Sequence, residues 1–154
     1  MKKIGLIIID PQVDFCDPNT GSLYVPGAEK SMERVANMID RIRDKLYAIN
    51  ITMDCHHELD IAHPIFWVDG SGKNSPNPFT IITVDDVKRS VWKAARLDLQ
   101  QKAVEYVEKL AANGRYPLCI WPPHCLIGEP IGEILAQTRR THCVRAEVIP
   151  VKLV

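Results

Sequence analysis

The run KIGLIIID, residues 3–10, constrains the fold more than any other segment of the chain. Its central residues are continuously apolar and mostly β-branched, which is typical of a parallel strand buried on both faces. We therefore expect a strand that lies in a sheet covered by helices on two sides. The run ends in a carboxylate, Asp10, and ligands of such sheets bind at the carboxyl ends of the strands.

Two later segments carry apolar residues at helical spacing. The first lies within residues 27–50 and the second near residues 99–111. The apolar positions are Val35, Met38, Ile39, Ile42 and Leu46 in the first, and Leu99, Ala103, Val107, Leu110 and Ala111 in the second. The second helix is expected to stop at the Asn-Gly-Arg sequence 113–115.

Further apolar runs predict strands at residues 47–54, 116–121 and 144–154, and residues 128–137 are expected to form a short helix. Strands that alternate with helices predict an α/β fold with a mainly parallel sheet and helices on both faces. Residues 57–95 are rich in proline, glycine and asparagine, so we expect a long irregular loop that acts as a lid or binding loop.

The composition indicates one domain over residues 1–154 that binds a small molecule. The chain has 46% hydrophobic and 25% charged residues, and its 19 basic and 19 acidic side chains cancel. Cancelled charge favours neither nucleic acid nor an anionic membrane as a partner. The N-terminal apolar run is too short to span a bilayer and has no cleavage site, so we expect a cytoplasmic protein. Its five cysteines show no C-x-x-C pair and are expected to be free thiols.

Asp54 and His56 form an Asp-x-His pair at the end of a predicted strand, where side chains two apart point to the same side. With His124, which follows another predicted strand, they would supply a carboxylate and two imidazoles to a metal ion. His57 or His63 could replace His56 or hydrogen-bond to a ligand. The alternative is that these are ordinary polar residues at the edge of a loop.

Asp10 could act as a general base at the mouth of the sheet, or it could cap the following turn, as Asp14 and Asp17 equally could. Phe15 and Trp121 could stack on a flat ring or belong to the core. Cys125 directly follows His124, and adjacent residues of an extended segment face opposite ways. If His124 points at a metal, Cys125 should therefore be a buried structural thiol.

Three motifs occur in order within a stretch that covers roughly residues 3–132. They are IIIDPQVDFCDPNTGSLYVPGA from residue 7, DCHH from residue 54 and WPPHCLIGEPIGE from residue 121. Together they resemble the nicotinamidase and pyrazinamidase branch of the isochorismatase-like cysteine hydrolases. The resemblance implies a three-layer αβα fold and hydrolysis of nicotinamide to nicotinate and ammonia. It also implies a divalent ion, zinc, iron or manganese, that holds the ring nitrogen of the substrate.

The resemblance assigns roles to individual residues. Asp10 would take the proton of a cysteine nucleophile, and Lys152 would support the developing charge. The metal ligands would be Asp54, His56 and His124, and the aromatic residues lining the ring pocket would be Phe15 and Trp121.

The same resemblance places the family's nucleophilic cysteine downstream of the lysine, whereas Cys143 precedes Lys152 here. We therefore expect a C-terminally incomplete member that lacks the family's last strands and helices and its nucleophile. An uncovered edge strand would favour a homo-oligomer.

Two alternatives remain at this stage. One is a non-catalytic remnant that binds metal and ring ligands, or a fragment that depends on a partner chain. The other is an isochorismatase-type ether hydrolase, against which the three metal ligands count.

Overall fold

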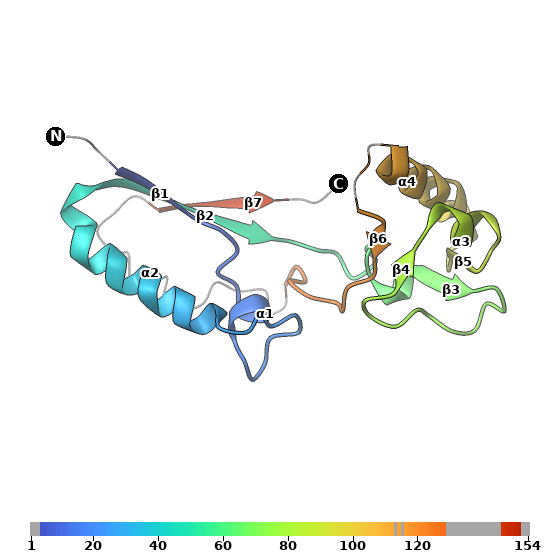
Figure 1. Cartoon of the computed structure of the whole chain (residues 1–154), viewed down its shortest axis with the longest axis horizontal. Helices are drawn as coiled ribbons and strands as arrows, with labels where there is room; N and C mark the ends of the chain where they lie inside the picture. The colour runs from blue at the N-terminus through green and yellow to red at the C-terminus, as the bar shows by residue number, and fades with distance from the viewer. Residues whose placement is uncertain (1–3, 113, 115, 129–145, 152–154) are drawn as a thin grey trace. The chain divides into compact units, whose positions relative to one another are not determined.

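The computed structural model describes residues 4–112, 114, 116–128 and 146–151 (Figure 1). The chain divides into two compact units, each with its own hydrophobic core. Unit 1 comprises Met1–His56 and His124–Val154, and unit 2 comprises His57–Pro123. In the described part of the chain, no helix combines the length and the apolar character that crossing a membrane requires.

Unit 1 is built on a three-stranded sheet. Its strands are β1 (Ile4–Ile8), β2 (Leu46–Asp54) and β7 (Ala146–Val151), in the order β1-β2-β7, and both pairs are parallel (Figure 1). Parallel neighbours need a crossover connection, which the helix between β1 and β2 provides. The strands predicted at residues 3–10, 47–54 and 144–154 are confirmed, over the residues that the structure describes, as β1, β2 and β7.

Helix α2 (Ala28–Ile42) packs against one face of this sheet. The register pairs Leu6 with Ile49 and Ile8 with Ile51, which brings their side chains to the face that the helix covers. The predicted amphipathic helix is confirmed, but its extension to Leu46 is wrong. The helix gives way to the 3-10 turn η1 (Arg43–Lys45), and Leu46 instead starts β2, where it packs on the same apolar cluster.

The prediction that the first strand is buried on both faces is wrong for the described residues. Ile8 is 4% exposed, whereas Ile7 and Ile9 are 64% and 71% exposed. Successive side chains of a strand point to opposite faces, and the apolar cluster of the described residues lies on the α2 side.

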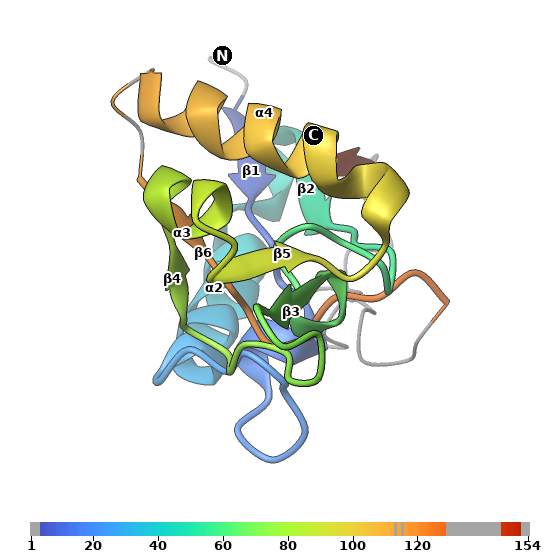
Figure 2. The ribbon, with the colours of Figure 1, turned by 90° about the vertical axis from the view of Figure 1, so that its right-hand side faces the viewer.

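Unit 2 replaces the irregular loop that we expected at residues 57–95. It contains the antiparallel pairs β3 (Trp67–Asp69) with β5 (Trp92–Ala94) and β4 (Ile81–Ile82) with β6 (Leu118–Cys119). Its helical segments are α3 (Val84–Lys88), α4 (Gln100–Ala112), η2 (Pro64–Phe66) and η3 (Leu97–Leu99) (Figure 2). Strands of two or three residues are too short to show a periodic pattern, which is why the sequence did not reveal them.

The short strands and helices of unit 2 pack around one hydrophobic core. Its buried residues are Phe66, Trp67, Ile82, Val87, Ala94, Ala103, Val107, Leu118 and Ile120. At the start of α3, Thr83 and Asp86 each accept a hydrogen bond from the other's backbone N–H, at 3.2 and 2.9 Å. This capping box satisfies two backbone groups that the helix leaves unpaired.

The predicted helix near residues 99–111 is confirmed as α4. The strand predicted at residues 116–121 is only partly confirmed, because β6 contains two residues and Tyr116 is 91% exposed. Its expected place in the parallel sheet is wrong, since β6 pairs antiparallel with β4. The helix predicted at residues 128–137 lies, apart from Gly128, outside the described residues.

Neighbouring isoleucines of β4 test the core of unit 2. Ile82 is 1% and Ile81 is 47% exposed. We expect Ile82→Ala to lower the free energy of unfolding of unit 2 by about 2–5 kcal/mol, because it leaves a cavity. Ile81→Ala is the matched control and should change it by less than about 1 kcal/mol. Urea unfolding followed by tryptophan fluorescence reports on unit 2, which contains Trp67, Trp92 and Trp121; equal losses would contradict the assigned core.

Candidate metal centre

Three side chains of unit 1 converge at the carboxyl end of β2. Asp54 is the last residue of the strand, and His56 lies two residues beyond it. His124 is the first residue of unit 1 after the residues that form unit 2. Their potential ligand atoms all lie within 4.8 Å of one another. The structure thus brings together the three residues that the sequence suggested as metal ligands.

Both imidazoles face the same carboxylate oxygen. Nε2 of His56 lies 2.9 Å and Nε2 of His124 lies 3.3 Å from Oδ2 of Asp54. The ring centroids are 4.7 Å apart, and the two histidine side chains are only 4% and 5% exposed. Two ring nitrogens and an oxygen are therefore presented to one small, largely dry volume.

The second oxygen of Asp54, Oδ1, is buried and has no hydrogen-bond partner among the described residues. A buried carboxylate oxygen without a partner is unfavourable, and a cation held by the same three side chains would compensate it. Nitrogen and carboxylate ligands of this kind suit zinc, iron or manganese. The group fits a divalent metal, whose identity the donor set alone leaves open.

The environment of Asp54 favours the ionised form of its carboxyl group, which is the form that binds a metal. Burial raises its pKa, but the hydrogen bonds and positive charge of His124 and His56 lower the pKa more. The result is a pKa well below the ordinary value for an aspartate. Asp54 is therefore ionised at neutral pH, as a metal ligand must be.

Gln12 fixes the backbone of Asp54. Its Oε1 accepts a hydrogen bond from the N–H of Asp54 at 2.7 Å, and its Nε2 donates one to the C=O of Asp54 at 2.9 Å. The side chain of Gln12 is completely buried. Since both backbone groups of the ligand residue are bound by one amide, Asp54 has little freedom to turn its carboxylate away.

Asp14 fixes the segment that carries His124. It lies in the single-turn helix α1 (Val13–Cys16) and is completely buried. One oxygen accepts a hydrogen bond from the N–H of Ser22 at 3.0 Å, and the other accepts a short one from the N–H of Cys125. A charged acceptor makes the stronger kind of hydrogen bond, and here it anchors the residue directly after His124.

The two histidine segments are also bound to each other. The N–H of His56 donates to the C=O of Cys125 at 3.1 Å, and the N–H of Ile127 donates to the C=O of His56 at 3.0 Å. These bonds form an isolated parallel bridge between His56 and Leu126. Cys125 itself has a φ of 49°, a left-handed conformation that is uncommon outside glycine.

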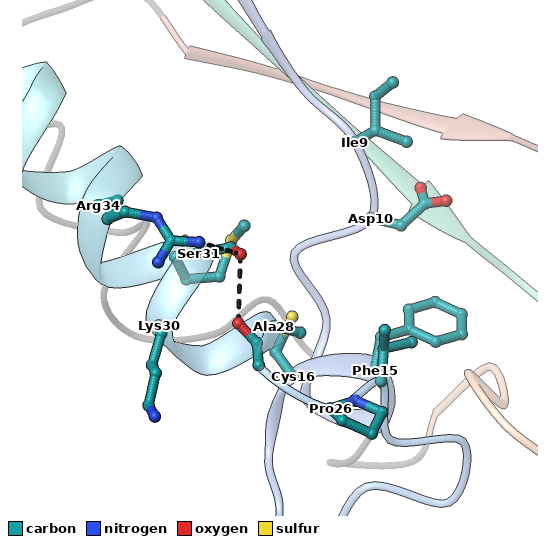
Figure 3. A pocket seen from close by; sticks show the side chains of 12 residues that line it. Ile9, Asp10, Phe15, Cys16, Pro26, Ala28, Lys30, Ser31 and Arg34 are labelled. Carbon is teal, nitrogen blue, oxygen red and sulfur yellow. Dashed lines mark hydrogen bonds between the residues drawn. The ribbon is translucent and has the colours of Figure 1, made fainter.

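Asp10 and Phe15 lie beside this group. Oδ1 of Asp10 accepts a hydrogen bond from the hydroxyl of Thr52 at 2.6 Å, and the ring of Phe15 makes an edge-on contact with His124 at 5.6 Å between centroids. Both residues line a pocket of about 600 Å³ that also includes residues of α2 (Figure 3). Figure 3 shows Ser31 and Arg34 on the helix side of that pocket.

The other candidate residues are not part of the group. Trp121 belongs to unit 2, where its ring contacts Phe79, so its role in a ring pocket stays a prediction. His57 is exposed, and the ring of His63 is buried within unit 2 and lies 3.4 Å from the C=O of Glu58. Lys152 and Cys143 lie outside the described residues.

The expectation that Cys125 is buried is confirmed, with 2% of its surface exposed. Burial raises the pKa of its thiol strongly, and the carboxylates of Asp14, Asp54 and Asp10 raise it further. Because the thiolate is the reactive form, Cys125 is an inert thiol at neutral pH.

The sequence did not reveal Gln12 and offered only a turn cap as a role for Asp14. Both residues stand in the first motif, at positions 12 and 14, and both are completely buried polar side chains. A buried polar side chain needs partners, and here the partners are backbone groups far along the chain. Each of the two has an apolar residue on either side in the sequence, and this was the available signal.

Comparison with known proteins shows the fold. No family model matches the chain, and no curated protein matches it. Among solved structures, the yeast nicotinamidase Pnc1p is 19% identical with a TM-score of 0.60, and the match covers 99% of this chain. An Acinetobacter baumanii nicotinamidase/pyrazinamidase is 17% identical with a TM-score of 0.54, covering 97%. The Bacillus subtilis nicotinamidase/pyrazinamidase PncA is 16% identical with a TM-score of 0.50, covering 99%.

These likenesses confirm the predicted fold class, the isochorismatase-like α/β fold that nicotinamidases and pyrazinamidases share. The chain spans 58%, 52% and 57% of the lengths of the three matched proteins. It is therefore shorter than they are.

The Gln12 contact can be tested by Gln12→Leu, which leaves the N–H and C=O of Asp54 buried without partners. We expect the opening free energy of β2 to fall by about 2–4 kcal/mol. Gln101→Leu on the exposed surface of α4 is the control and should have an effect of about 0.5 kcal/mol or less. Hydrogen exchange of peptides containing Asp54 measures the effect; unchanged protection in Gln12→Leu would contradict the assigned contact.

Alkylation with iodoacetamide tests the state of Cys125. Its raised pKa and its burial should leave it unmodified in the native protein at pH 8, while the partly exposed Cys55 reacts. Unfolding in urea should make both equally reactive. Mass spectrometry of the tryptic peptides gives the readout, and rapid native modification of Cys125 would show that its thiol is accessible.

Proposed function

We propose that this chain is an amidohydrolase of the nicotinamidase type, whose metal centre consists of Asp54, His56 and His124. One observation carries the proposal: the ligand atoms of Asp54, His56 and His124 lie within 4.8 Å of one another, and the second carboxylate oxygen of Asp54, Oδ1, is buried without a hydrogen-bond partner among the described residues. The isochorismatase-like fold supports the same class of reaction.

The substrate we propose is a small heteroaromatic amide such as nicotinamide. A structure of the yeast neighbour, 20% identical with a TM-score of 0.59, is bound to the inhibitor nicotinaldehyde. In this chain the edge-on contact of Phe15 with His124 places an aromatic side chain directly beside the proposed ligands. A pyridine or pyrazine ring that reaches the centre would meet both an aromatic surface and nitrogen-binding chemistry.

When bound, the ion would supply an electron-pair acceptor for the ring nitrogen of the substrate. The residues of the chain would do the rest. Asp10, held by the hydroxyl of Thr52, would receive the proton of the attacking thiol and return it to the leaving ammonia. Lys152 would stabilise the negative charge that develops on the amide oxygen.

Neither Cys16 nor Cys125 suits the role of nucleophile. Burial raises the pKa of Cys16, and that of Cys125 is raised further by three carboxylates, so neither is an activated thiol. We propose that turnover depends on a cysteine outside the described residues, such as Cys143. A module that binds metal and ring ligands without turnover is the second candidate, favoured by the inert Cys125 next to His124.

Metal binding tests the centre directly. Zinc titration of the purified original protein should show about one bound ion per chain. His57→Ala is the matched control and should bind zinc as the original protein does. His56→Ala and His124→Ala should each weaken zinc binding by at least about tenfold, because each removes one ligand. Equal weakening by His57→Ala would mean that the ligand set is misassigned.

Ammonia release from nicotinamide then separates the two candidate functions. Turnover that is lost in Cys143→Ala would assign the nucleophile to this chain. Metal binding and nicotinamide binding without turnover would support the non-catalytic module. Zinc binding without any affinity for nicotinamide would contradict both.

A further inference from the structure

The pocket beside Asp10 has two walls of different chemistry, and both belong to unit 1. One wall is formed by the residues directly after β1, by α1 and by the loop before α2, and it is mostly apolar. The other wall is the first half of α2, which carries the cationic side chains of Lys30 and Arg34 (Figure 3). Nicotinamide is neutral, so the proposed substrate does not explain why two cations line this pocket.

The apolar wall includes Ile9, Phe15 and Val25. Ile9 and Val25 are 71% and 52% exposed. The N–H of Val25 donates to the C=O of Phe15 at 2.9 Å, and the N–H of Ala28 donates to the C=O of Val25 at 3.0 Å, so the backbone ties this wall to the start of α2. Single exposed apolar side chains are common, but a group of them on one wall of a pocket indicates a contact surface.

The two cations of the other wall lie close together on the helix. Lys30 and Arg34 are four positions apart, so their side chains share one face of α2, and like charges at this spacing destabilise a helix. The guanidinium of Arg34 is held in place, because its Nη2 donates to Oγ of Ser31 at 2.9 Å and this hydroxyl donates to the C=O of Gly27 at 3.2 Å. An anion bound between the two side chains would relieve their repulsion.

The acidic side chains nearby do not supply that anion. Within the described part of the chain, neither of the two cationic side chains forms an ion pair. The carboxylate of Glu29 accepts a hydrogen bond from the hydroxyl of Tyr24 at 2.7 Å, and Glu33 does not line the pocket. Asp10, the acidic residue among the described lining residues, lies on the opposite wall (Figure 3).

We propose that this pocket binds an aromatic acid, whose flat apolar body lies against Phe15 and Val25 and whose carboxylate or phosphate is held by Lys30 and Arg34. Pockets of about 300–1,000 Å³ accommodate drug-sized ligands, so the volume of about 600 Å³ has room for more than one ring. The site goes beyond the proposed function, because it takes an anion and none of the three proposed metal ligands lines it.

Two probes of the same shape test the preference for an anion. 2-Naphthoate and 2-naphthamide share one ring system and differ in charge. Titration of the complete chain without zinc, followed by the NMR signals of backbone amides, should show naphthoate binding at least about fivefold more tightly than naphthamide. The largest shifts should occur at Phe15, Ala28 and Ser31. Equal affinities for the two probes, or shifts confined to other residues, overturn the proposal.

Four variants assign the contacts. Lys30→Gln and Arg34→Gln should each weaken naphthoate binding by about 3- to 10-fold and leave naphthamide binding within about twofold. Arg41→Gln is the matched control, because Arg41 is an exposed cation of the same helix that does not line the pocket, and it should change neither affinity by more than about twofold. Val25→Ala should weaken both probes equally, by about 2- to 3-fold. Equal losses in Arg41→Gln and Arg34→Gln would mean that the helix attracts anions without a site, which overturns the proposal.

Two further titrations identify the anion and separate this site from the metal centre. Tighter binding of 2-naphthyl phosphate than of 2-naphthoate would assign a phosphate ester as the natural ligand, and the reverse order would assign a carboxylate. Adding zinc to the original protein, or replacing His56 by alanine, should leave naphthoate binding within about twofold. Naphthoate binding that requires zinc would place the acid on the metal and overturn the proposal, whereas naphthoate binding by a chain that binds no zinc would refute the proposed function alone.

Discussion

The candidate metal centre depends on two buried polar side chains that contact backbone rather than ligand atoms. Gln12 binds both polar backbone groups of Asp54, and Asp14 binds the N–H of Cys125, next to His124. Both come from the short segment after β1. One segment therefore sets the positions of two ligand residues that are 70 positions apart in the chain, and burial makes these contacts hard to exchange for water.

This arrangement separates the roles of the two units. Unit 1 contains all three proposed metal ligands. Unit 2 is inserted into unit 1, starting directly after His56 and ending directly before His124. The parallel bridge between His56 and Leu126 joins the two segments of unit 1 on either side of this insertion. The proposed ligand set therefore belongs to unit 1 alone.

The sequence predicted the elements whose patterns are long. β1, β2, α2 and α4 follow from apolar runs and helical spacing, and Asp54, His56 and His124 follow from strand ends and motif order. It did not predict β3 to β5, because strands of two or three residues show no period, nor the antiparallel partner of β6. It also missed Gln12, since a contact with a backbone group 42 positions away leaves no local pattern.

X-ray absorption spectroscopy of the zinc-loaded chain would test whether Asp54, His56 and His124 bind the ion, because it identifies the ligand atoms themselves. We expect a first shell of nitrogen and oxygen with the scattering pattern of two imidazoles and no sulfur. A shell that contains sulfur would mean that a cysteine binds the ion. A shell with fewer than two imidazoles would mean that Gln12 and Asp14 position Asp54 and the segment of His124 for another purpose.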